Sequence, residues 1–302
     1  MPSEQMVKNL VRLKSQEYGI PMEQVYSLYG LEQLMKKLSH SPLKENLVLK
    51  GGFLLMTRYG LASRATKDLD TTVREMILTE EKMNEIIEYL TSPNEMGQKE
   101  FSLISKRSTR ADFDFPGYGL KLYFHLGKMK MKLDLDITVG EDLLPINKFE
   151  KIHLMFEEGT VEFPTYPIEQ ILADKIYATA AYGAIDDTNT RTKDLYDIYF
   201  LTKVHNDIDY SKVFQAVKRT KRQRDNVTSV LAYPMIIDKL SHSVRQQEFW
   251  KRYSDNNSFA KNLEFETVMK SVKQLAEVLK SKEPSKLNRD NQNHVNKGRG
   301  VR

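Results

Sequence analysis

Two acidic segments constrain the fold of this chain more than any other feature. Asp68 and Asp70 lie on either side of one leucine, and Asp134 and Asp136 repeat the arrangement. Residues two apart in a β-strand point to the same face of the sheet, so each pair would direct both carboxylates to one side. Adjacent carboxylates repel each other unless a cation lies between them, and Mg²⁺ held by carboxylates and substrate phosphates removes that repulsion. We therefore predict a strand at each segment and a metal site beside them.

The second acidic segment lies in a predicted β-hairpin. Apolar and polar residues alternate over 120–126 and again over 129–139, and a Gly-Lys pair between the two runs supplies a turn. An aspartate of this hairpin, either Asp134 or Asp136, would complete a three-carboxylate cluster with the first acidic segment. The alternative is a pair of charged strand faces that are only solvated.

A glycine pair precedes the first acidic segment. Gly51 and Gly52 follow the apolar run 47–49 and Lys50. Glycine lets the backbone turn sharply, and N–H groups at the start of a helix can approach an anion closely. Together with the acidic segments, the pair predicts a nucleotide-phosphate site next to a metal site.

Composition excludes several other kinds of site. The 302 residues include no cysteine, which rules out disulfides, thiol catalysis and cysteine–zinc sites. The six histidines are scattered without the spacing of a metal-ligand pair, which argues against a zinc enzyme. No apolar run approaches the roughly 20 residues that span a bilayer, and the first residues lack an apolar signal core. The sequence therefore predicts a cytoplasmic protein that does not enter a membrane.

The residue pattern changes near the middle of the chain. We expect helices at 4–39 (interrupted at 19–21), 52–59 and 79–90, and strands at 47–49, 66–74, 101–113, 120–126 and 129–139. Beyond two prolines near residue 165 the pattern indicates helices only, at 168–182, 193–202, 210–219, 228–240, 244–253 and 263–279. We predict an α+β fold with a mixed sheet and flanking helices in residues 1–163, a helical domain in 164–281, and a basic, disordered tail in 282–302.

Positive charge is concentrated in one part of the helical half. The net charge is only +5, but a cluster gathers Lys218, Arg219, Lys221, Arg222 and Arg224. Such a cluster suits a polyanionic partner such as RNA. The alternative is a lysine-rich helix face that confers solubility.

Five motifs, in order, resemble one family. They are KGGFLL at 50–55, RATKDLD at 64–70, LDIT at 135–138, IEQILADK at 168–175 and RTKDLYD at 191–197. This series resembles the AbiEii/AbiGii toxin family, a branch of the DNA polymerase β-like nucleotidyltransferases that is related to the MenT toxins. The resemblance runs from about residue 45 to 205. Gly-Gly stands here where many superfamily members have Gly-Ser.

The resemblance implies a toxin of a bacterial toxin–antitoxin or abortive-infection (phage-defence) system. The implied reaction transfers a nucleoside monophosphate from an NTP to an RNA, with the tRNA 3′ end as the expected acceptor. Two Mg²⁺ ions, or Mn²⁺ in their place, would serve as cofactors. A cognate antitoxin is implied as a partner that need not bind directly.

Residue roles follow from the same motifs. Asp68, Asp70 and Asp136 would be catalytic metal ligands, and Lys175 and Asp194 further catalytic residues of a helical domain that completes the active site. The nucleotide would contact Lys50, Gly51, Gly52, Arg64, Lys175, Arg191 and Lys193, and the basic cluster would contact RNA. Lys175 could instead pair with Asp174 or Glu169, and Asp194 could only cap a helix.

Two other functions fit the same residues. A protein nucleotidylyltransferase that modifies Ser, Thr or Tyr would use the same metal site. A non-catalytic RNA-binding module could retain the fold, although all three candidate metal carboxylates are present.

Overall fold

The computed structural model divides into two compact units. The sheet unit comprises residues 1–167 with 257–259, and the helical unit comprises 168–256 with 260–302. The structure describes residues 2–61, 66–109, 117–139, 142–146, 149–224 and 228–284. The sequence predicted the division after residue 163, whereas the units divide after Pro167.

A five-stranded mixed sheet forms the centre of the sheet unit. Its order is β1 (Leu47–Lys50), β2 (Asp68–Val73), β5 (Met129–Thr138), β4 (Gly117–Leu126) and β3 (Phe101–Thr109). β2 and β5 run parallel, and the other neighbours run antiparallel. The expected α+β class and the predicted β4–β5 hairpin are confirmed.

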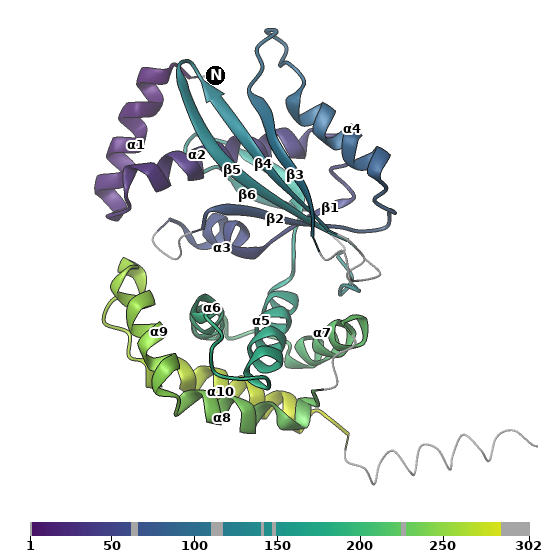
Figure 1. The fold of residues 1–302 in the computed structure, drawn as a ribbon, viewed down its shortest axis with the longest axis vertical. Helices are drawn as coiled ribbons and strands as arrows, with labels where there is room; N and C mark the ends of the chain where they lie inside the picture. The colour runs from purple at the N-terminus through teal and green to yellow at the C-terminus, as the bar shows by residue number, and fades with distance from the viewer. Residues whose placement is uncertain are drawn as a thin grey trace, which may run out of the picture. The chain divides into compact units, whose positions relative to one another are not determined.

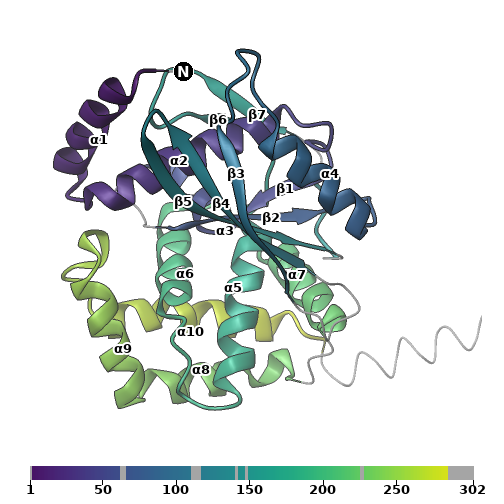
Figure 2. The same ribbon diagram turned by 45° about the horizontal axis from the view of Figure 1, so that its top comes forward.

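Residue alternation along β5 gives the sheet one apolar face. Leu133, Leu135 and Ile137 are fully buried, whereas Asp134 and Asp136 between them are half-buried. Helix α2 (Met22–Ser39) packs on the apolar face so closely that a Cβ at Gly30 would lie 2.9 Å from the Leu133 side chain. Figures 1 and 2 both show α2 crossing behind β4 and β5. The acidic residues therefore lie on the opposite face.

Other helices complete the sheet unit. They are α1 (Glu4–Tyr18), α3 (Gly51–Tyr59) and α4 (Glu80–Thr91). The predicted break near residue 19 is confirmed, because α1 ends at Tyr18 and is followed by Gly19, whose φ of 64° is left-handed. Such a conformation favours glycine and stops the helix.

Two strands were not predicted. β6 (Phe149–His153) and β7 (Thr160–Pro164) pair antiparallel as a separate small sheet. In β6 only Ile152 is buried, so the sequence carries almost no alternation. β3 ends at Thr109, and the rest of the predicted strand, 110–113, lies outside the described residues.

The helical unit contains six α-helices within the described residues. They are α5 (Ile168–Gly183), α6 (Thr192–Val204), α7 (Tyr210–Gln223), α8 (Tyr233–Ser241), α9 (Val244–Asp255) and α10 (Phe265–Ser281). The helix predicted at 228–240 begins instead as a 3₁₀ turn, Val230–Ala232, and α8 has Pro234 in its first turn, where no amide donor is needed. No described helix combines the length and apolarity required to cross a membrane.

Candidate functional site

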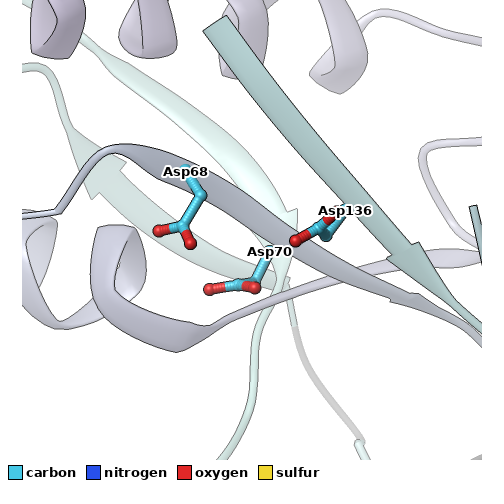
Figure 3. Close-up of side chains that lie close together, drawn as sticks. All are labelled: Asp68, Asp70 and Asp136. Atoms are coloured by element: carbon cyan, nitrogen blue, oxygen red, sulfur yellow. The ribbon is translucent and has the colours of Figure 1, made fainter. Parts of the chain in front are cut away.

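Three carboxylates converge on the open face of the sheet. Because β2 and β5 are neighbouring parallel strands, Asp70 lies opposite Asp136, and Asp68 lies opposite Asp134, two residue pairs further along. Ligand oxygens of Asp68, Asp70 and Asp136 all lie within 4.8 Å of one another, and all three residues are half-buried. Figure 3 shows their carboxylates directed toward a common region beside the two strands.

The electrostatics of this cluster favour a cation. Burial raises the pKa of Asp136, and repulsion from Asp68 and Asp134 raises it further. Arg107 and Lys50 oppose this rise without cancelling it. Hard carboxylate oxygens at this spacing suit Mg²⁺ or Mn²⁺, and a bound divalent ion would relieve the repulsion. The residues present therefore fit a divalent metal.

Asp134, the other candidate from the sequence, has a different environment. It lies opposite Lys121 on β4, and Lys121 Nζ is 2.6 Å from Asp134 Oδ1. Its side chain is 41% exposed. The cluster of three forms with Asp136, while Asp134 forms an ion pair at its border.

Gly51 adjoins the cluster at the junction of β1 and α3. Its φ is 67°, and a Cβ at this position would lie 1.9 Å from Asp70 Oδ2. Only glycine allows both the left-handed backbone and this close approach. Gly51 and Gly52 are also the first residues of α3, where backbone N–H groups lack intrahelical partners and can bind an anion.

Polar side chains hold the border of the cluster. The Thr66 hydroxyl donates to Asp68 Oδ1 at 2.7 Å. Lys50 Nζ donates to Thr138 Oγ1 at 2.6 Å and lies 5.6 Å from the centre of the Tyr166 ring. The motifs assigned Lys50 to the nucleotide, whereas no sequence pattern predicted a positioning role for Thr66 or Thr138. Arg64, also assigned to the nucleotide, lies outside the described residues.

A second charged cluster lies within the helical unit. Lys175 Nζ on α5 is 2.6 Å from Asp194 Oδ1 and 2.9 Å from Asp197 Oδ2, both on α6. Asp194 and Asp197 are 0% and 1% exposed. Arg191 Nε lies 2.6 Å from Asp194 Oδ2. The i, i+3 spacing in the sequence put Asp197 on the same helix face as Asp194, but only Asp194 was predicted as a site residue.

This cluster keeps a buried carboxylate ionised. Burial would raise the pKa of Asp194, but the charges and hydrogen bonds of Lys175 and Arg191 outweigh that effect and lower it to about 2. Lys175 and Arg191 therefore compensate the buried negative charge on α6. Lys193 is adjacent in the sequence but exposed.

The predicted RNA-binding cluster lies on α7 and at its end. Lys218 and Arg222 are exposed, one helical turn apart. Lys221, Arg219 and Arg224 are half-buried, and the Arg224 guanidinium lies 5.3 Å from the centre of the Tyr177 ring. The fully exposed part of the cluster is therefore smaller than the sequence suggested.

Comparison with known proteins places these features in a family. Residues 33–278 match the family described as "Nucleotidyl transferase AbiEii toxin, Type IV TA system". MenT4, a nucleotidyltransferase toxin from Mycobacterium tuberculosis, has a similar fold with a TM-score of 0.61, 17% identity and 92% coverage of each chain. JHP933 from Helicobacter pylori aligns with a TM-score of 0.46 and 18% identity over 89% of this chain and 94% of that one. None of the curated proteins matches this chain.

The family match covers most of the chain, including both acidic strands and the helices that carry Lys175 and Asp194. It confirms the resemblance that the motifs predicted. The chain therefore belongs to the AbiEii family of nucleotidyltransferase toxins of type IV toxin–antitoxin systems.

Proposed function

We propose that this nucleotidyltransferase transfers a nucleoside monophosphate from an NTP to the 3′ hydroxyl of an RNA, with the tRNA 3′ end as the foremost acceptor. The observation that carries the proposal is the cluster of Asp68, Asp70 and Asp136 beside the glycine-led start of α3. Carboxylates for metal and backbone amides for phosphate are the two components that this reaction requires. A cognate antitoxin would restrain the activity.

The three aspartates would hold Mg²⁺, as two ions, or Mn²⁺. When bound, such ions activate the attacking hydroxyl and neutralise charge on the leaving pyrophosphate. Thr66 fixes the Asp68 carboxylate through its 2.7 Å hydrogen bond. The absence of a side chain at Gly51 leaves room for the Asp70 carboxylate. Positioning and electrostatics carry most of this type of reaction, so these residues need supply little other chemistry.

The triphosphate would be bound by amides and cations. Gly51 and Gly52 present backbone N–H groups at the start of a helix, where the helix dipole also favours negative charge. Lys50 is held next to the cluster by Thr138. Arg64, Lys175, Arg191 and Lys193 are further candidates for phosphate contact, and Asp194 would set the position and charge of Lys175.

RNA is the proposed acceptor because of the positive charge that the chain presents. The exposed pair Lys218 and Arg222 on α7 suits phosphate contacts that depend little on sequence. Neutralising both should raise KM for RNA and weaken its salt dependence, while KM for the NTP stays the same. Equal KM and salt slope in a folded double variant would remove this surface from the proposal.

One experiment tests the acceptor. The protein is incubated with each labelled NTP in turn, with Mg²⁺, total bacterial RNA and total bacterial protein, and the two pools are then separated. The proposal predicts label on RNA that is removed by trimming of the 3′ end. Label on Ser, Thr or Tyr of protein would overturn it in favour of protein nucleotidylylation, and absence of label in both pools would favour a non-catalytic module.

A further inference from the structure

The open face of the sheet continues beyond the carboxylate cluster. Along β4 and β5, the cross-strand pair Gly119–Asp136 is followed on the same face by Lys121–Asp134, Tyr123–Lys132 and His125–Lys130. Residues two apart on a strand share a face, so these side chains form a continuous strip that begins at Asp136. We call the five residues Lys121, Tyr123, His125, Lys130 and Lys132 the hairpin strip.

The strip combines exposed cations with partly exposed rings. Lys121, Lys130 and Lys132 are exposed, and Tyr123 and His125 are half-buried. Lys130 Nζ lies 5.8 Å from the centre of the Tyr123 ring. The ring centres of Tyr123 and His125 are 6.2 Å apart. The strip thus places two rings on β4 beside two lysines on β5.

The charge of the strip is positive, and one of its rings is held in place. Asp134 compensates Lys121 at 2.6 Å, which leaves Lys130 and Lys132 as the net charge. His125 Nε2 lies 2.8 Å from the Ser102 hydroxyl on β3, so the imidazole is fixed on the sheet. Burial and the nearby Lys130 lower the pKa of His125, which keeps the ring uncharged at neutral pH.

Aromatic rings on an open sheet face, between cations, are the features with which proteins bind unpaired RNA. Bases stack on the rings, and the cations contact the phosphates. We propose that the hairpin strip binds the unpaired 3′-terminal nucleotides of the RNA acceptor and leads the terminal hydroxyl to Asp136. This inference rests on the proposed function, and adds the site and the single-stranded character of the acceptor.

The dimensions of the strip favour a single strand. From Lys130 to Asp136 a strand advances about 20 Å at 3.3–3.4 Å per residue, enough for a few extended nucleotides. A paired helix buries its bases against each other and offers no faces for rings to stack on. The strip therefore suits an RNA end that extends beyond any duplex.

A binding experiment without NTP tests the inference. A short unpaired RNA oligonucleotide with a 5′ fluorophore is titrated with the full chain, and fluorescence anisotropy gives Kd at several salt concentrations. Tyr123→Leu should weaken binding about tenfold, because it removes the stacking surface, whereas Tyr123→Phe should retain it. Lys130→Ala/Lys132→Ala should also weaken binding and reduce the salt slope by about 1.4.

A matched control separates the strip from general charge. Lys251→Ala/Lys270→Ala removes the same charge from exposed positions of α9 and α10 and should leave Kd within about twofold of the wild type. Blunt duplex RNA should bind more weakly than the unpaired oligonucleotide. Melting temperatures of all variants check that each one folds.

Three results of the binding experiment would overturn the inference. They are no measurable binding of the oligonucleotide by wild type, equal losses in the strip and control variants, and equal binding by Tyr123→Leu and Tyr123→Phe. Failure of the proposed function looks different. In that case the oligonucleotide binds through the strip, but the wild type transfers no nucleotide to RNA. Conversely, transfer with the same KM for RNA in strip variants would refute the strip and leave the proposed function intact.

Discussion

Gly51 and Asp70 are so close that any side chain at residue 51 would collide with the Asp70 carboxylate. A Cβ at residue 51 would lie 1.9 Å from Oδ2 of Asp70 and 2.8 Å from its Cβ. The same glycine has a φ of 67° and begins α3. The turn that starts the helix is therefore also the space that the Asp70 carboxylate requires, which couples the proposed phosphate site to the proposed metal site.

Gly51→Ala should abolish nucleotide transfer by displacing Asp70. Gly60→Ala, at the other end of α3, is the matched control, because Gly60 also has a left-handed φ of 86° but nothing lies within 4 Å of its added Cβ. Backbone strain should lower the free energy of unfolding of each variant by about 1–2 kcal/mol. Both variants are compared by urea unfolding and by their rates of nucleotide transfer. Equal activity of the two variants would contradict the displacement of Asp70 by an alanine at residue 51.

Metal binding should stabilise the fold through Asp136 and not through Asp134. Mg²⁺ at a hundred times its Kd should add about 2.7 kcal/mol to the free energy of unfolding, seen as a rise in Tm. Asp136→Asn should lose this rise, and Asp134→Asn should retain it, since Asp134 pairs with Lys121. A Tm rise that persists in Asp136→Asn and disappears in Asp134→Asn would reverse the assignment.

Without metal, the Asp136 carboxylate should destabilise the fold once it ionises. Its pKa is raised by burial and by Asp68 and Asp134, so its favourable contribution is present below its ordinary pKa of about 3.9 and is lost as the pH rises through the folded value. In EDTA, Asp136→Asn should therefore be at least as stable as wild type at neutral pH. A clear loss of stability in Asp136→Asn would contradict repulsion between Asp136 and its neighbours Asp68 and Asp134.

Asp194 should give the opposite dependence on pH. Lys175 and Arg191 lower its pKa to about 2 against the opposing effect of burial, so its contribution is present above about 3.9 and is lost as the pH falls toward 2. The loss should be on the order of 2 kcal/mol. Asp194→Asn should remove this component of the pH dependence, measured by denaturant unfolding between these limits. An unaltered profile would show that the ion pairs do not stabilise the native state.

Lys175 should affect both stability and nucleotide binding, and the two effects can be separated. Lys175→Met leaves Asp194 and Asp197 buried without this cation, which should cost about 3–5 kcal/mol. Adding Asp197→Asn should restore part of the stability by removing one of the two charges. KM for the NTP should stay raised in the double variant if Lys175 contacts phosphate. Recovery of a normal KM together with stability would assign Lys175 a structural role only.

Local patterns predicted the elements that carry the site. Alternation over 129–139 and a turn at Gly127 gave the β4–β5 hairpin, and the two-residue spacing put Asp68 and Asp70 on one face. These features depend only on residues that are near one another in the sequence, so the sequence was sufficient to predict them. The weakly alternating strand β6 depends on tertiary contacts and was not predicted. The helix predicted from residue 228 begins instead as a 3₁₀ turn shortly before a proline, so its start was misplaced.

Residue patterns within one segment could not predict contacts between distant residues, and Asp136 was named as a metal ligand only through the family motif. Which aspartate of β5 faces Asp70 depends on the register of two parallel strands 66 residues apart, seen as Asp70 opposite Asp136. The pairing of Lys175 with Asp197 depends on how α5 packs against α6. Gly119 on β4 lies opposite Arg107 on β3 and opposite Asp136 on β5. Because glycine has no side chain, Arg107 can approach Asp136 across it.

Catalysis by the three-carboxylate cluster is tested by the rate of labelled NMP transfer to RNA at saturating Mg²⁺. The rate is measured for wild type, Asp136→Asn and Asp134→Asn. We expect Asp136→Asn to lower the rate by at least about a hundredfold, whereas Asp134→Asn should stay within about tenfold of wild type. Equal rates for wild type and a folded Asp136→Asn variant would contradict catalysis by the cluster of Asp68, Asp70 and Asp136.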